Sequence, residues 1–363
     1  MKISFVVPAV FACVACFAGV TVGAQAQGAV DIYGVLDAGV VAERACEACV
    51  RNKVSGGVAS GSRLGIKGRE ALGEQVSAVF AMEAGILNDS GASDQNGRLF
   101  GRQAYIGLDS RLGALTVGRQ YNPQYLTLTD VADPFKGGMA GNAGNLMGYT
   151  AKRYDNAIKY MTPQLRGLSA SALYSFGESP YSSATNRAYG AMLGYAKGPV
   201  TLSVAHQRKN NFIEASGTLP SVDTSARNTL VAANVNFGPA TAFAAYGINK
   251  GPGSSPWDPA NPYGALGLMA TSANSRDALL GVAVPFGGAT FLASYIRKDD
   301  RDVRNRDARQ IAVGVTYSLS RRTDLYSSYA KIRNLNGAAY TVGNASDAGR
   351  ADAAFNFGLR HAF

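Results

Sequence analysis

Few side chains of this sequence could perform covalent or metal chemistry. The 363 residues include only two histidines and four cysteines. His206 and His361 each share the alternation of apolar neighbours, which places them on apolar strand faces. The sequence contains no G-x-S-x-G nucleophile motif and no Walker-type glycine loop. We therefore interpret the chain as not an enzyme, with no catalytic residue, no cofactor and no metal site.

The cysteines are also poor candidates for chemistry. Cys46 and Cys49 have no histidine or second cysteine pair nearby, so a four-ligand zinc site is not expected. The βαβ context of a redox motif is absent as well. In an exported chain the pair is interpreted as a possible loop disulfide. Cys13 and Cys16 lie in the amino-terminal segment without a good lipobox, which argues against a lipid anchor there.

The amino terminus is typical of a secretory signal peptide. Lys2 precedes an almost wholly apolar stretch, residues 3–24, which ends in the small-residue site Ala24-Gln25-Ala26. A retained membrane helix is the alternative, but Pro8 and two glycines weaken it. We predict a signal peptide at 1–26. Because cleavage removes Lys2, the remaining 27–363 hold 34 basic and 25 acidic residues, a net charge of +9.

Composition excludes several classes of protein. Hydrophobic residues make up 47%, charged residues 17%, and glycines number 43. Glycine thus exceeds its usual share of about 7%, and charge falls below its usual 25% or so. The chain is too apolar for a disordered protein and lacks the Gly-X-Y period of collagen. A mean hydropathy of −0.03 argues against a bundle of membrane helices.

Two long uncharged runs distinguish strands from membrane helices. Residues 228–249 and 278–296 carry no charge, but each run is broken in the middle, at 237–239 and at 285–288. Each half is about nine or ten residues, the length of a tilted strand that crosses a bilayer. The runs therefore predict two membrane hairpins.

Residue alternation supports this interpretation. Ile311, Val313 and Val315 alternate with small residues such as Ala312 and Gly314. One apolar face and one small, polar face fit a wide barrel with lipid outside and water inside. We predict an all-β fold, a 16-stranded antiparallel transmembrane β-barrel. The expected strands are about 30–41, 62–69, 74–86, 98–109, 114–121, 154–162, 168–177, 187–197, 200–208, 227–237, 240–249, 276–285, 289–298, 308–319, 323–333 and 352–363.

Several motifs resemble the Gram-negative general porins. Ser-Arg-Leu-Gly-Ile-Lys-Gly at 62–68, followed by Glu-Ala-Leu-Gly at 70–73, is similar to the second strand and first turn of that family. Segments 102–108, 115–119 and the carboxyl end 356–363 are similar too. The resemblance implies a homotrimer of 16-stranded barrels in the outer membrane. It also implies that the terminal Phe363 is presented for barrel assembly.

The same resemblance implies a constriction inside the barrel. The longest connection, about 122–153, matches the loop that the family folds into its lumen. The family pattern has Pro before an acidic residue, whereas here Asp133 precedes Pro134 and Lys136 adds a cation. We expect Asp130 or Asp133 to face the pore, with Asp130 favoured by position.

A basic wall is expected opposite this loop. The positions that match the family's arginine ladder are Arg63, Arg119 and Arg153. Alternation independently directs Arg63 and Lys67 inward, because Leu64 and Ile66 face lipid. Arg102 shares the parity of the lipid-facing set, so its position is open between a rim and a bulge.

We expect a water-filled channel for passive diffusion of small hydrophilic solutes and ions. The net charge, Lys136 and the basic run at 297–306 favour a weak anion preference. A porin specific for small anions such as phosphate or organic acids is the alternative, and an adhesin or structural barrel is a further one. Expected partners are two further copies, outer-membrane lipid and lipopolysaccharide, and the barrel-assembly machinery, with no nucleic acid.

Overall fold

The described part of the chain forms one closed β-sheet. The computed structural model describes residues 28–44, 52–180, 182–213, 221–256 and 272–363, so the signal segment, Cys46 and Cys49 lie outside it. Two short strands, β2 (Asn52–Gly56) and β5 (Ala92–Ser93), accompany sixteen barrel strands. These sixteen are β1 (Ala29–Arg44), β3 (Arg63–Gly73), β4 (Val76–Leu87), β6 (Gln103–Ser110), β7 (Gly113–Tyr121), β8 (Arg153–Met161), β9 (Leu168–Ser175), β10 (Ala188–Lys197), β11 (Val200–Ile213), β12 (Val222–Asn236), β13 (Thr241–Lys250), β14 (Asn274–Phe286), β15 (Ala289–Asp300), β16 (Ala308–Ser318), β17 (Thr323–Asn334) and β18 (Ala353–Ala362).

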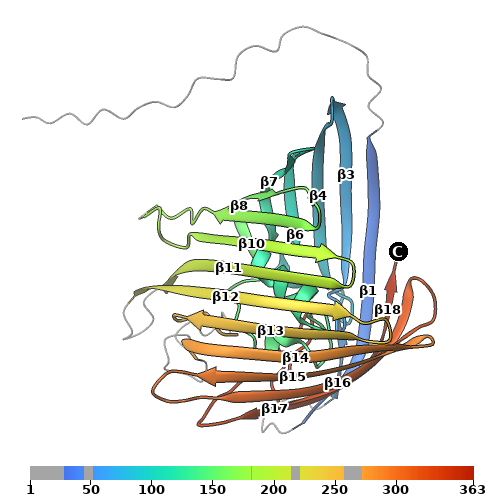
Figure 1. Ribbon diagram of the computed structural model, residues 1–363, viewed down its shortest axis with the longest axis vertical. Coiled ribbons are helices and arrows are strands. Elements are labelled where there is room, and N and C mark those ends of the chain that lie inside the picture. The colour runs from blue at the N-terminus through green and yellow to red at the C-terminus, as the bar shows by residue number, and fades with distance from the viewer. Residues whose placement is uncertain (1–27, 45–51, 181, 214–220, 257–271) are drawn as a thin grey trace, which may run out of the picture.

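Pairing of the first and last strands closes the barrel. All strand pairs are antiparallel, and β1 pairs with both β3 and β18. The carboxyl-terminal Phe363 exchanges two backbone hydrogen bonds of 3.0 Å with Gly34, and the C-terminus lies beside β1 (Figure 1). Closure gives each of the sixteen described barrel strands a neighbour on both sides, as a barrel in hydrocarbon requires. The predicted 16-stranded antiparallel barrel is confirmed.

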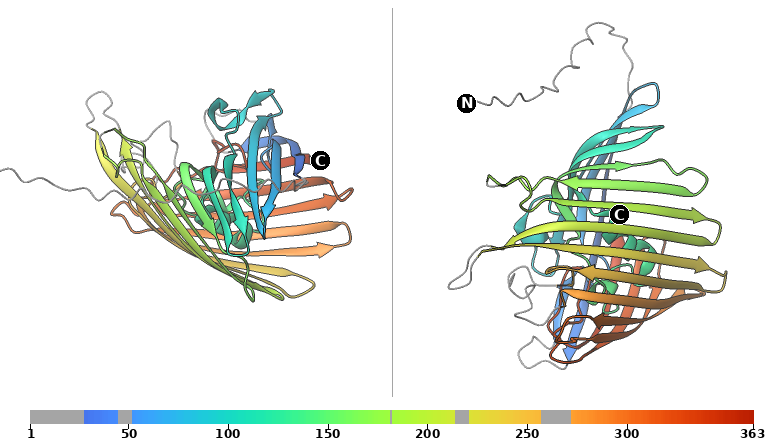
Figure 2. Two further views of the ribbon diagram at one scale, coloured as in Figure 1. Left: turned by 90° about the horizontal axis from the view of Figure 1, so that it is seen from above. Right: turned by 60° about the vertical axis from the view of Figure 1, so that its left-hand side comes forward.

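The apolar and the small, polar faces of the strands lie outside and inside the barrel, as the alternation predicts. On β16, Ile311 and Val313 are 62% and 52% exposed, whereas Gln310 and Ala312 are buried within the barrel. The two uncharged runs form the hairpins β12–β13 and β14–β15, and strands β10 to β17 lie side by side (Figures 1 and 2). No helix in the described residues is both long and apolar enough to span a membrane.

Two connections differ from the sequence prediction. The strand expected at 98–109 begins only at Gln103, because residues 98–102 form a turn and a bend. The loop expected at 42–61 contains β2, which pairs with residues 38–42 in the carboxyl-terminal half of β1. After β2 the chain turns into the barrel at 57–61, where Val58 is fully buried.

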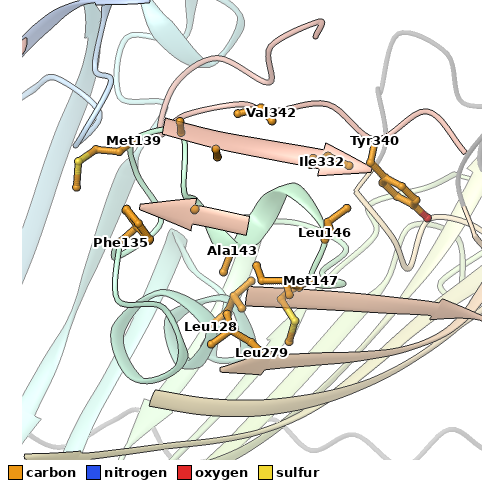
Figure 3. Close-up of a cluster of buried hydrophobic side chains, with 14 of the residues drawn as sticks. Leu128, Phe135, Met139, Ala143, Leu146, Met147, Leu279, Ile332, Tyr340 and Val342 are labelled. Atoms are coloured by element: carbon orange, nitrogen blue, oxygen red, sulfur yellow. The ribbon is translucent and has the colours of Figure 1, made fainter. Parts of the chain in front are cut away.

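The buried apolar cluster lies inside the barrel. It joins the connection between β7 and β8, residues 122–152, to the inner wall (Figure 3). Phe135 lies against Gly314, where an added Cβ would come within 2.8 Å of its ring, and Pro134 lies equally close to Gly281. These two wall glycines make room for the tip of the loop. The packing therefore fixes the loop within the lumen.

The lipid-facing side predicts a measurable cost for charge. Leu280 lies midway along β14 and is 65% exposed on the outer face. We expect Leu280→Arg to lower the free energy of unfolding in lipid vesicles by about 2–4 kcal/mol. Val303, fully exposed in a loop, provides the control, and Val303→Arg should change it by less than about 0.5 kcal/mol. Equal effects of the two variants in urea unfolding would contradict the assignment of the outer face.

Candidate functional site

The connection 122–152 narrows the lumen. It contains α2 (Pro123–Leu126), a π-helical turn η1 (Thr127–Ala132) and a 3-10 turn η2 (Ala143–Asn145). Asn122 starts α2 by accepting a hydrogen bond from the Gln124 amide, and Pro123 fits the first turn. The turn η1 packs against β11, β12 and β13. The predicted constriction loop therefore lies against one wall of the barrel.

Asp133 lies in the interior of this loop. Its carboxylate accepts hydrogen bonds of 2.9 Å from the backbone amides of Phe135, Gly137 and Ala143. The side chain is 1% exposed, and burial raises its pKa to about 6 against the opposing effect of the three amides. Asp133 thus holds the turn at the loop tip, and the structure does not bring it to the water of the lumen.

Asp130 and Lys136 lie on the exposed side of the loop. Asp130 accepts a hydrogen bond of 2.9 Å from the Thr129 hydroxyl. Partial burial raises the pKa of Asp130, while the Thr129 hydrogen bond and the charge of Lys136 oppose that shift. Because η1 packs against β11–β13, the exposed side faces the opposite wall. Asp130 and Lys136 are thus the two exposed charged residues of the loop, whereas Asp133 is buried.

A cluster of arginines lies around one buried carboxylate on the facing wall. Arg102 donates from Nε to Glu83 at 2.6 Å, and Arg63 lies 3.7 Å from the same carboxylate. Tyr33 also donates to Glu83, at 2.9 Å. Arg63 further donates to the Ser60 hydroxyl at 3.1 Å. Glu83 thus orders two arginines and offsets part of their charge.

Tyr121 joins a third arginine to this cluster. Its hydroxyl accepts from Arg102 at 2.8 Å and also from Arg153, whose guanidinium lies 4.2 Å from the centre of the Tyr121 ring. Next to Arg153, burial and the neighbouring arginine charges lower the pKa of Lys152 to about 8. We call Arg63, Arg102, Lys152 and Arg153 the lumen cations.

Two predicted wall residues lie apart from the lumen cations. Arg119 pairs with Asp155 and donates to the Gly101 carbonyl at 2.7 Å. It shares the parity of the lipid-facing Val117, next to a register shift between β7 and β8. Lys67 faces inward above the Tyr33 ring, but nearer the short-turn end, where its closest acid is Asp31 at 3.9 Å.

The sequence leaves the position of Arg102 open and gives Glu83 no role. Arg102 lies in a bend one residue before β6 begins, so strand alternation does not determine its direction. Glu83 occupies the inward parity of β4, together with the buried Ala81. That parity is the signal by which Glu83 could have been found.

Two further segments complete the constriction. In the segment 57–61, the Val58 carbonyl accepts a hydrogen bond of 2.8 Å from the Met139 amide of the loop. The last long connection, 335–352, folds onto the same loop, where Asn142 donates to the Asn344 carbonyl at 3.2 Å. Asp37 holds the first segment by accepting from the Val58 amide at 2.9 Å. The constriction is therefore built from three segments, whereas the sequence predicted one.

A buried ion pair anchors the return arm of the loop. Lys298 lies 2.7 Å from Asp277, and both side chains are fully buried. Asp277 also accepts from the Gly148 amide at 2.8 Å. Since a buried carboxylate needs its partner, Asp277 ties the end of the loop to β14 and β15.

The barrel order places Arg63 opposite the loop turn that carries Asp130. Counted round the sixteen described strands, β3 and β12 are eight strands apart in either direction. Arg63 lies on β3, and Asp130 lies on the turn that packs against β12. Fixed charges of opposite sign across a narrow passage create a transverse field. Such a site can sort dissolved ions and dipoles by charge.

Comparisons with known proteins agree with this geometry. A family model described as Gram-negative porin matches residues 9–337. An outer membrane porin protein of Bordetella pertussis is 31% identical, covering 87% of this chain and 92% of the relative. Outer membrane porin protein 32 of Delftia acidovorans is 27% identical, covering 94% and 95%. The solved anion-selective porin from Comamonas acidovorans has a TM-score of 0.75 at 26% identity, covering 93% and 100%.

The two loop carboxylates should respond differently to substitution. Asp133→Ala removes the acceptor of three backbone amides, which costs about 3 kcal/mol of local stability if one or two of them stay unpaired. We expect noisy, enlarged single-channel currents in a planar bilayer. Asp130→Asn, the matched control on the exposed side, should keep steady currents and shift selectivity toward anions. Steady native currents from Asp133→Ala would contradict the structural role of Asp133.

Proposed function

We propose that this chain, which belongs to the Gram-negative porin family, forms a general diffusion channel with a weak preference for anions. It is an outer-membrane porin, and small hydrophilic solutes cross it passively. The observation that carries the preference is the set of lumen cations. Arg63, Arg102 and Arg153 lie on the wall, and Lys152 lies beside them at the end of the loop. Glu83 is ion-paired among the arginines, and Asp130 lies on the loop turn opposite Arg63.

The charges of the lumen support selectivity in this direction. A cluster with more cations than carboxylates raises the local concentration of anions within a Debye length of about 8–10 Å. Lys136 adds a further exposed cation to the loop. The name of the Comamonas relative, an anion-selective porin, supports the same sign. The relatives are channels, and we infer that this chain likewise catalyses no reaction.

We propose that the mature barrel assembles with two further copies in the outer membrane. Signal cleavage after Ala26 leaves a barrel of residues 27–363, with the long connections on the outer side of the membrane. Exposed apolar side chains on β1 and β3, such as Val40 and Leu64, support packing against two further copies. Phe363, which pairs with Gly34 at the closure, is the residue we assign to recognition by the assembly machinery. Lipopolysaccharide is the proposed lipid partner.

A channel specific for small anions is the second candidate. It is favoured by the arrangement of Arg102 and Arg153 on one Tyr121 hydroxyl, which could form a site for a carboxylate or phosphate. Conductance that saturates with one anion would support it. Conductance that rises in proportion to salt supports general diffusion.

Reversal potentials across a salt gradient test the anion preference. The native channel should show a higher permeability for chloride than for potassium. Arg63→Gln combined with Arg153→Gln should reduce or reverse that ratio, because half of the lumen cations are lost. Arg166→Gln, at an exposed short turn, is the control and should leave it unchanged. A native channel that prefers potassium would disprove the proposal.

The preference should also depend on pH. Since the pKa of Lys152 is lowered to about 8, its charge is lost as pH rises through that value. The anion preference should therefore weaken between about pH 7 and pH 9, where arginines stay charged. Lys152→Met should lower the preference at pH 7 and remove this pH dependence. A native channel whose chloride-to-potassium permeability ratio stays constant over this pH range would contradict the assignment of Lys152.

A further inference from the structure

A row of cations follows the outer face of the barrel near the long connections. Each member shares the parity of lipid-facing residues such as Val204, Leu280 and Ile311. All but Arg208, which is partly exposed, are exposed. Strands β11 to β17, which carry them, lie side by side in Figure 1. The members of this basic row are Arg208, Arg227, Lys250, Arg276, Arg297, Arg309, Lys331 and Arg333.

Strand register places like charges next to one another in this row. Arg227 lies directly between Arg208 and Lys250 on the neighbouring strands. Arg309 lies in the same way between Arg297 and Arg333. Directly opposite like charges destabilise an antiparallel sheet. The bare barrel therefore carries a repulsion along this row that an anionic ligand would relieve.

The protein itself supplies little compensating charge. Among the ion pairs of the described residues, Arg297 is the one member of the row that takes part, with Asp299 at 3.6 Å. That carboxylate also binds Arg301 at 3.1 Å. The other seven members form no ion pair within the described ranges. Asp299 also lies directly opposite Arg276 in the strand register, but it is shared with Arg297 and Arg301. One carboxylate leaves most of the charge of the row uncompensated by the described chain.

A cavity interrupts the middle of the row. It has a volume of about 290 Å³ and is lined by Ile248, Lys250, Asn274, Arg276 and Arg301. Three of its five lining residues are cations and one is an amide, which are donors for phosphate oxygens. Arginine binds phosphate through two parallel hydrogen bonds, and lysine binds it as a point charge.

The height of the row matches a lipid headgroup. Arg276 lies four residues along β14 from the lipid-facing Leu280, and Arg297 follows the outward Tyr295 on β15. A cation at the centre of the hydrocarbon costs about 2–4 kcal/mol, but near the interface the cost falls to about 0–1 kcal/mol. The row therefore marks the level at which hydrocarbon ends and phosphates begin.

We propose that the basic row binds the phosphate groups of outer-leaflet glycolipid, with one phosphate seated between Lys250 and Arg276. This inference rests on the proposed orientation of the barrel, with its long connections outside. It places the lipid partner on β11 to β17 and assigns the cavity as its central contact. The acyl chains of the same lipid would cover the apolar residues below the row.

Binding of lipopolysaccharide to the purified porin in detergent tests the proposal. One variant combines Arg227→Gln, Lys250→Gln and Arg276→Gln. Its control removes three exposed cations at the opposite, short-turn end: Arg166→Gln, Lys197→Gln and Arg321→Gln. Since each surface cation contributes a factor of about five, we expect the first variant to bind roughly a hundredfold more weakly. The control should bind like the native chain.

Further arms identify the ligand chemistry. Enzymatically dephosphorylated lipopolysaccharide should bind the native porin as weakly as intact lipid binds the first variant. Native binding by that variant, or equal loss in the control, would overturn the proposal. Equal binding of intact and dephosphorylated lipopolysaccharide would also overturn it, because the contact would then be apolar alone. Displacement of the lipid by inorganic phosphate at matched concentration would overturn it as well, because the site would then bind free anions. Native conductance of both variants would show that they are folded and would separate this result from the channel function.

Discussion

Closure of the sheet between β1 and β18 is the constraint on which the rest of the structure depends. In hydrocarbon, an unpaired backbone amide or carbonyl costs several kcal/mol, so every strand needs two neighbours. The hydrogen bonds between Gly34 and Phe363 complete the last pair. Once the sheet is closed, each strand has one face in lipid and one face inside. Apolar residues must then face outward, and the interior is left to polar side chains and water.

Because the apolar residues face outward and the polar ones inward, the loop has to be fixed in the lumen by specific contacts. A soluble domain would orient a loop by burying apolar surface beneath it, but the inner wall is mostly small and polar. The loop therefore packs through a few apolar residues such as Phe135 and through buried charges. Asp133 satisfies three amides within the loop, and the pair Asp277–Lys298 ties its return arm to the wall. Removing either partner of such a pair leaves an uncompensated buried charge.

The sequence predicts the barrel better than it predicts the constriction, for a physical reason. Alternation is repeated sixteen times, so single errors do not change the fold, and the pattern locates all the barrel strands to within a few residues. One side chain at a strand end has no such redundancy. A bend before β6 turns Arg102 inward, and a register shift beside β7 leaves Arg119 with Asp155. One extra residue moves every later side chain of a strand to the other face of the sheet.

The loop carboxylates and the infolded segments are hidden from the sequence for another reason. Asp130 and Asp133 have the same side chain three residues apart, and only the folded turn decides which one binds backbone amides. Segments 57–61 and 335–352 have the small, polar composition of solvated loops. The burial of each depends on a distant part of the chain, since Met139 contacts the first segment and Asn142 contacts the second. Local pattern carries no information about such contacts.

The net charge of +10 is therefore a poor guide to ion selectivity in this chain. Eight of its cations form the basic row on the outer face, on the far side of the barrel wall from the permeating ions. Salt screens exposed charges beyond about 8–10 Å, so the row has little influence on the lumen. Selectivity depends instead on the few groups that line the constriction, where water is confined and the charges are fixed. Alternation thus divides one arginine-rich sequence into two electrostatic systems, one for the solute inside and one for the lipid outside.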